Sequence, residues 1–132
     1  MDIGSYDAKD ILRFLAERFT GIGDMTVTSE PPSTIDASIG KYVVVSLPSR
    51  IYSTGGYGRT TARISLWARD KNFTSPNFIG ENVGVLSTMQ RAVYDKIPYV
   101  KGNYSVSNPQ VLPGGVKNGF HVWHIQCDLI IT

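Results

Sequence analysis

His121, His124 and Cys127 are the residues of this sequence with the widest chemical repertoire. The two histidines are three positions apart in a segment whose apolar residues alternate as in a strand, so their side chains point to opposite faces. They cannot bind one ion together from there, and no cluster of histidine, cysteine and carboxylate ligands is visible elsewhere in the sequence. We therefore expect surface or rim histidines and no metal site.

Cys127 is the only cysteine, which excludes an intrachain disulfide and a multi-cysteine metal cluster and fits a reducing cytosol. Buried free cysteines are common and mostly inert, so we interpret Cys127 as a small apolar core residue rather than a catalytic thiol. The carboxylates are dispersed along the chain. No two of them are placed by local spacing to act as acid and base, although distant residues can converge in a fold.

The run Gly55-Gly56-Tyr57-Gly58 raises the question of a phosphate-binding loop. It lacks the lysine and hydroxyl residues that end a P-loop, and it joins two predicted strands instead of opening a helix. We interpret it as a mobile hairpin tip. These observations predict a chain with no catalytic residue and no cofactor. The alternative, an enzyme of unknown type, requires a pocket in which His121, aspartates and tyrosines converge from distant positions.

Charge patterning gives the clearest sign of binding. From Ala37 to Arg69 the chain has no acid, and its basic residues there are Lys41, Arg50, Arg59, Arg63 and Arg69. This surface fits contact with a phosphate backbone or with an acidic patch on a neighbouring subunit, and a solvated strand face is an equally good interpretation. Trp67 shares the expected solvent-facing side with Arg63, and tryptophan beside arginine is typical of interface anchors. The candidate subunit or partner contacts are Arg50, Tyr52, Tyr57, Arg59, Arg63, Trp67 and Arg69.

The helices that would position these residues follow from apolar periodicity. The segment from Ala8 to Phe19 has an apolar stripe at helical spacing, with Ser5 or Asp7 as its cap. A second helix is predicted to start at Ser75-Pro76, because proline is tolerated in the first turn, and to be stopped by Pro98.

The strands follow from β-branched and alternating apolar residues. They are predicted at Met25–Thr28, Lys41–Leu47, Arg59–Arg69, Tyr104–Leu112 and Phe120–Ile131. The second and third of these form a hairpin, whose extended and flexible tip is Ile51–Gly58. Pro113-Gly114-Gly115 is a turn signal between the last two strands.

At 132 residues the chain fits one domain, residues 1–132. Its apolar share of 42% and charged share of 18% are those of a globular protein, and its net charge of +2 argues against the dense basic stripe of a dedicated nucleic-acid binder. We predict an α+β fold in the order α-β-β-β-α-β-β, with an antiparallel sheet packed by two main helices. No apolar run approaches the roughly 20 residues that span a bilayer, and no signal peptide is visible. We therefore expect a protein kept in the cytoplasm or assembled there into something larger.

Four features follow one another along nearly the whole chain. They are an amphipathic helix (Ala8 to Phe19), a hairpin with a long glycine-rich tip (Lys41 to Arg69), a helix beginning near Pro76, and a closing hairpin that contains Phe120-His121-Val122-Trp123. This layout resembles the tail-terminator and tail-completion proteins of tailed bacteriophages, that is, the lambda-type terminator and the related head–tail joining proteins.

The resemblance implies a single tail-terminator-like α+β domain and a structural virion protein rather than an enzyme. Members of that family form homo-oligomeric rings, often hexamers, at the head-proximal end of the tail. The ring stops polymerisation of the tail tube and meets the head connector, while DNA passes through without sequence-specific contact. The implied partners are the chain itself, the tail-tube protein and the connector protein, with assembly in the bacterial cytoplasm and no membrane. The loop from Arg50 to Arg59 would then line the ring or contact a neighbour. The alternative is a nucleic-acid-binding accessory domain that uses the basic hairpin, residues 41–69.

Overall fold

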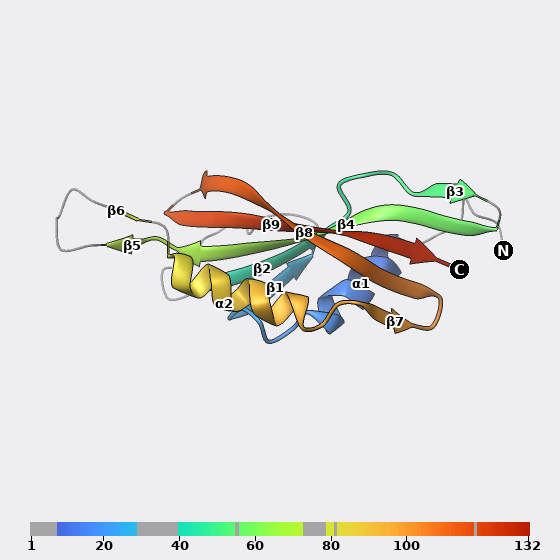
Figure 1. The fold of residues 1–132 in the computed structure, drawn as a ribbon, viewed down its shortest axis with the longest axis horizontal. Coiled ribbons are helices and arrows are strands. Elements are labelled where there is room, and N and C mark those ends of the chain that lie inside the picture. The colour runs from blue at the N-terminus through green and yellow to red at the C-terminus, as the bar shows by residue number, and fades with distance from the viewer. Residues whose placement is uncertain (1–7, 29–39, 55, 73–78, 81, 118) are drawn as a thin grey trace.

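Nine strands and two helices are present in the part of the chain that the computed structural model describes, which is residues 8–28, 40–54, 56–72, 79–80, 82–117 and 119–132 (Figure 1). In chain order the elements are α1 (Ala8–Arg18), β1 (Met25–Thr28), β2 (Lys41–Ser46), β3 (Tyr52–Thr54), β4 (Tyr57–Arg69), β5 (Lys71–Asn72), β6 (Ile79–Gly80), α2 (Val83–Tyr94), β7 (Tyr99–Lys101), β8 (Tyr104–Lys117) and β9 (Phe120–Ile131). The expected α+β class is confirmed. The structure adds β3, β5, β6 and β7 to the elements expected from the sequence.

A single curled sheet organises the molecule. Its strands follow the order β1-β2-β4-β9-β8-β7, and β3 pairs with β4 beyond the end of β2. All neighbours are antiparallel except β1 and β2. β4 is central because its 13 residues are long enough to pair with β9 from Gly58 to Arg69 on one side and with β2 and β3 on the other.

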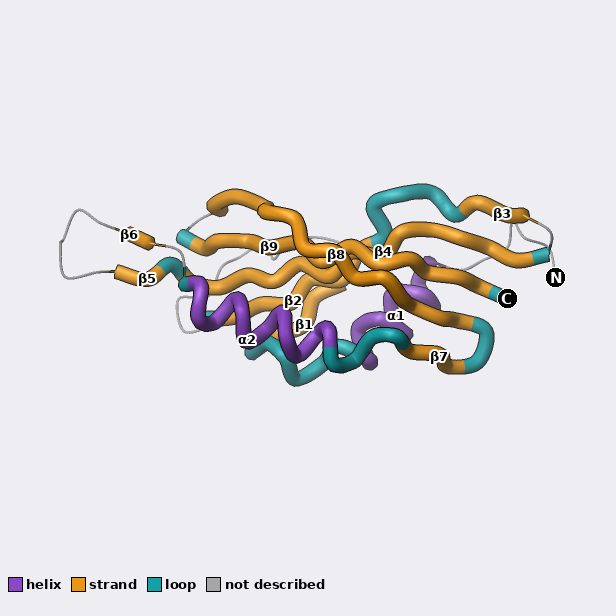
Figure 2. The backbone as a smooth tube through the Cα atoms, viewed as in Figure 1, coloured by secondary structure: helices purple, strands orange, loops and turns teal. Residues whose placement is uncertain are grey.

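Both helices pack on the same face of this sheet. α1 contributes its buried Ile11, Phe14 and Leu15, and α2 contributes its buried residues at matching helical spacing. These side chains meet the apolar side chains of β4 and β9, including Ile64 and Ile125, in one core cluster. The arrangement of helices against strands can be followed in Figure 2. We call the opposite side of the sheet the outer face.

The first helix agrees with its prediction, and the second requires a correction. The proposed caps of α1, Ser5 and Asp7, lie outside the described residues. α2 begins at Val83 and not near Pro76. Asn82 caps it through a 3.4 Å hydrogen bond donated by the Val85 amide. Ser75-Pro76 also lies outside the described residues, but Ile79, which falls inside the helix predicted between Pro76 and Pro98, is in β6. An apolar residue at helical spacing does not by itself extend a helix past a better cap.

The hairpin tip is more regular than expected. The sequence predicted an extended flexible tip over residues 51–58, but Tyr52 pairs with Arg59 and Thr54 with Tyr57, so the strands continue to a tight turn. Gly56 has a φ of +91°, which favours glycine in such a turn. The Thr60 hydroxyl holds the preceding loop against β4 by donating to the carbonyls of residues 49 and 50, both at 3.0 Å.

The predicted turn at Pro113-Gly114-Gly115 is wrong. β8 runs through these residues to Lys117, and the chain reverses between Lys117 and Phe120, at Gly119. The pairing register shifts at the proline and glycines, which therefore form a bulge inside the strand. Gly114 is needed there because a Cβ would lie 2.7 Å from Nε2 of His124.

Candidate interaction surface

Strand β4 sends its odd-numbered side chains to the outer face. Its even-numbered residues, such as Ala62 and Ile64, are in the core under the helices. Alternation along a strand therefore places Arg59, Thr61 and Arg63 on the other side of the sheet. The register with β9 is continuous from Gly58 to Arg69, so no bulge in β4 interrupts this alternation.

Four of the seven contact residues predicted from the sequence come together at one end of this face. We call the group formed by them and Thr61 the outer strip: Tyr52, Tyr57, Arg59, Thr61 and Arg63. Tyr52 lies directly across from Arg59 in the β3–β4 pair. Tyr52 is 61% exposed and Tyr57 37% exposed. Aromatic and arginine side chains in this arrangement have the composition that is enriched in protein interfaces.

Arg63 is the polar residue of the outer strip that is least satisfied within the chain. It is half-buried between its cross-strand neighbours, Ser46 on β2 and Gln126 on β9. Its Nε is buried and has no hydrogen-bond partner. Leaving a buried donor unpaired costs about 1–3 kcal/mol.

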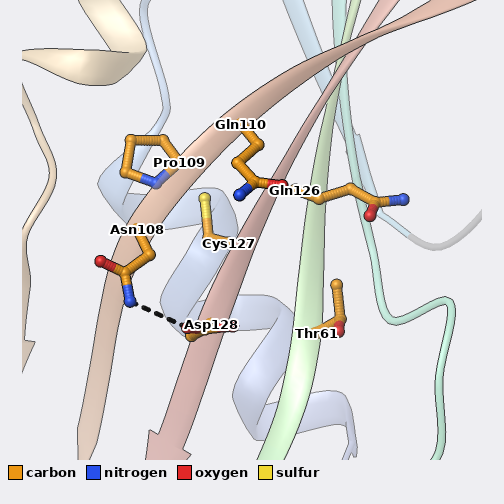
Figure 3. Close-up of a pocket in the computed structure, with 7 residues that line it drawn as sticks. All are labelled: Thr61, Asn108, Pro109, Gln110, Gln126, Cys127 and Asp128. Carbon is orange, nitrogen blue, oxygen red and sulfur yellow. Dashed lines mark hydrogen bonds between the residues drawn. The ribbon is translucent and has the colours of Figure 1, made fainter.

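A polar groove of about 520 Å³ lies beside the outer strip on the same face. Figure 3 shows its lining, with residues from β4, β8 and β9: Thr61, Asn108, Pro109, Gln110, Gln126, Cys127 and Asp128. The groove exists because the register of β8 shifts between Ser107 and Gln110, where Asn108 has a φ of 55°. The side-chain amide of Asn108 donates a hydrogen bond to Oδ2 of Asp128 at 2.9 Å. No local pattern of residues marks this bulge, so the groove could not be predicted from the sequence.

Trp67 does not belong to this exposed surface, and its expected exposure is wrong. It is only 3% exposed. It packs in a second apolar cluster, on the outer face at the other end of β4, with Tyr42, Val44, Phe120 and Val122. Its ring centroid lies 6.1 Å from that of Phe120. Alternation gave the correct face for Trp67, but it does not show whether other residues cover that face.

The remaining two predicted contacts lie at the margins. Arg69 sits beside the buried cluster, with its guanidinium carbon 4.9 Å from the centroid of the Phe120 ring. Its position fits an intramolecular cation–π contact. Arg50 is exposed in the loop before β3 and close in sequence to the outer strip. The outer strip and Arg50 therefore form the exposed part of the predicted surface.

The reactive side chains have separate partners inside the fold. His121 Nδ1 contacts Oδ1 of Asp70, and His124 Nδ1 lies 2.7 Å from the Ser65 hydroxyl. Burial, followed by the nearby charge of Asp128, raises the pKa of the Cys127 thiol to about 12, so that it stays protonated at neutral pH. The described residues contain no group of three or more histidine, cysteine or acidic side chains that could hold a metal ion.

Neither helix, in the portion of the chain that the structure describes, has the length and apolar character needed to cross a bilayer. The candidate functional surface is the outer strip with its neighbouring polar groove. Searches against protein-family models and against curated proteins found no match to this chain.

Proposed function

We propose that this chain is a structural virion protein of a tailed bacteriophage. It would form a homo-oligomeric ring at the head-proximal end of the tail, end polymerisation of the tail tube, and join the tail to the head connector. The proposal includes the layout α-β-β-β-α-β-β of the main elements and assembly in the bacterial cytoplasm. Two observations support the proposal: the resemblance in sequence layout and the interaction surface on the sheet.

One observation carries the proposal: the outer strip has large aromatic and arginine side chains that the fold leaves exposed. Tyr52 and Tyr57 are exposed aromatics, and Arg59 beside them is exposed as well. Binding to another protein subunit would cover these side chains. A stable specific contact buries roughly 1,000 Å² or more in total, and this strip with its groove and margins is the candidate for one half of it.

The partners follow from the position of such a ring. The first is a further copy of the chain, with six copies as in the resembled family. The second and third are the tail-tube protein and the head connector protein. DNA would pass through the ring without sequence-specific contact, and neither membrane nor cofactor is involved.

Assembly state and location test this proposal. Sedimentation velocity at high micromolar concentration should show an oligomer, and electron microscopy of phage particles labelled through the C-terminus of this chain should place the label at the head–tail junction. The proposal fails if the chain is monomeric at every concentration and is absent from the particles.

A second candidate function, a nucleic-acid-binding accessory domain, is favoured by the absence of acids from the whole β2–β4 hairpin. Exposed Arg50 and Arg59 flank two exposed tyrosines at its tip. Arginine for phosphates and aromatic rings for base stacking are the usual components of a single-strand-binding surface. Affinity for a single-stranded oligonucleotide should then fall steeply with salt and weaken in Arg59→Ala. Absence of binding at low salt would remove this candidate.

A further inference from the structure

We propose that the edge strand β7 of one subunit pairs with the edge strand β3 of the next copy, so that the sheet continues from subunit to subunit. The inference rests on the proposed ring-forming function and deepens it, because it names both halves of the subunit contact. The occupant of each open edge is therefore a second copy of this chain.

β3 and β7 are the two borders of the sheet at one end of the molecule. Across that end the strands follow the order β3-β4-β9-β8-β7, with β3 and β7 on opposite sides (Figure 1). Among the residues that the structure describes, β3 pairs only with β4, and β7 pairs only with β8. Each of these three-residue strands thus has a side on which no described strand lies, and such an edge can pair with another chain.

A single row of paired residues joins the two edges. It crosses all five strands and consists of Tyr52, Arg59, Ile130, Ser105 and Val100. Residues directly opposite each other on neighbouring strands point to the same face, so the whole row lies on the outer face. The row ends at Tyr52 on β3 and at Val100 on β7. The two edges are therefore at the same level of the sheet, and the Val100 of one copy can meet the Tyr52 of the next.

The two ends of this row are also the most exposed large apolar side chains of the described residues. Val100 is 69% exposed and Tyr52 is 61% exposed. Pairing of the edges would bring these side chains together, because neighbouring strands lie about 4.8 Å apart. The next most exposed is Val116 at 59%, which pairs with His121 near the opposite end of β8 and belongs to neither edge strand.

The charged side chains around the edges leave the ends of the row uncharged. Lys101 follows Val100 and points to the core face, where its Nζ lies 3.9 Å from Oε2 of Glu17. Arg59 is one strand inside the β3 edge, and Arg50 is in the loop before β3. The side chains that would meet directly are therefore the tyrosine and the valine.

The strand directions are those that a ring requires. Each of the four steps from β3 across the sheet to β7 is antiparallel, so β3 and β7 run in the same direction. Copies that keep the same orientation would therefore pair β7 with β3 in parallel. Such a contact is heterologous and repeats in one sense, which generates either a closed ring or an open filament. A two-fold contact would instead pair β3 with β3, or β7 with β7.

Cysteine cross-linking tests the pairing directly. Tyr52→Cys and Val100→Cys are made singly and together in the full-length chain, whose own Cys127 is buried. Paired residues on neighbouring strands lie within the range of about 4.4–6.8 Å between Cα atoms that a disulfide requires. After mild oxidation, the double variant should give covalent multimers larger than dimers on a non-reducing gel. Neither single variant should cross-link alone, and an equal mixture of the two should give dimers only.

Val100→Lys tests the contribution of the edge to assembly. It should weaken self-association at least about tenfold in sedimentation velocity, because the contact would bury the valine and a buried lysine is costly. Val116→Lys is the matched control, since it makes the same change at a similarly exposed valine outside β3 and β7. Its self-association should equal that of the unchanged chain. Thermal melts of both variants as monomers should also match the unchanged chain, because both positions are exposed.

Three results would overturn the pairing. If the chain assembles but a single cysteine variant cross-links with itself, the contact is two-fold rather than heterologous. If the chain assembles, yet the double variant does not cross-link or Val100→Lys assembles as the unchanged chain does, the contact lies elsewhere and the proposed function still stands. If the unchanged chain is monomeric at every concentration and is missing from phage particles, the proposed function fails together with this inference.

Discussion

Truncation of Trp67 separates a core residue from an interface anchor. In the structure Trp67 is 3% exposed and packs with Tyr42, Val44, Phe120 and Val122, all of them buried. A tryptophan buries about 150–250 Å², which at about 25 cal/mol per Å² gives an upper bound of about 4–6 kcal/mol. Measured truncations of buried aromatic residues to alanine cost about 3–5 kcal/mol, because the cavity closes only in part. We expect Trp67→Ala to lower the free energy of unfolding by that amount.

The expected change is large enough for a thermal melt. A domain of this length has an unfolding entropy of about 0.28 kcal/mol/K, so the loss corresponds to a fall in Tm of about 11–18 °C. The melt should be followed by circular dichroism at a concentration where the chain is monomeric. Tyr52→Ala is the matched control, since Tyr52 is 61% exposed and its loss should change stability by less than about 0.5 kcal/mol.

The opposite pattern would refute this reasoning. If Trp67→Ala leaves the monomer's Tm unchanged but weakens self-association, Trp67 is exposed in solution and acts as an anchor, as the sequence had suggested. If both properties change, repeating the melt over a range of concentrations separates them, because the stability of a monomer does not depend on concentration.

Two further predictions concern glycine positions and the thiol. Gly114→Ala should destabilise the fold by about 1–3 kcal/mol, because its Cβ would lie 2.8 Å from the Val122 carbonyl oxygen. Gly84→Ala should stabilise the fold by about 0.5–1 kcal/mol, because Gly84 is in α2 and has open space around it. Urea unfolding measures both free-energy changes. The Cys127 thiol should resist alkylation at pH 8 until the chain unfolds. Its folded pKa of about 12 is above the unfolded value of 9.0, so its contribution to stability is complete below pH 9 and is lost as the pH rises toward 12. Rapid alkylation of the native protein, or a Cys127→Ala variant with the same stability loss across that pH range, would contradict this account.

Much of the sheet follows from local patterns. The alternation of β4 gave its two faces correctly, and the apolar stripe from Ala8 to Phe19 predicted the helix found over Ala8–Arg18. The start of α2 did not follow, because Ile79 continued the helical spacing although it belongs to a short strand. Periodicity alone cannot distinguish a helix residue from a neighbouring strand residue at the same spacing.

The candidate site was predictable only in part. Arg59 and Arg63 are four positions apart on one predicted strand, so their common face could be read from the sequence. Tyr57 had been assigned to the hairpin tip, and the structure places it on the same strand. The unpaired Nε of Arg63 and the groove beside it could not, because both depend on which side chains of β8 and β9 lie next to β4. A second bulge of β8, separate from the one that opens the groove, took the place of the turn expected at the proline and glycines.

By itself, the sequence determined the α+β class, the face on which each β4 side chain lies, and the absence of acids from the basic hairpin. Only the tertiary structure decided which parts of the outer face are covered. It buried Trp67 and left Tyr52 exposed, although both are large aromatics on that face. The physical reason is that side-chain direction is set by neighbouring backbone atoms, whereas burial is set by contacts between segments far apart in the chain.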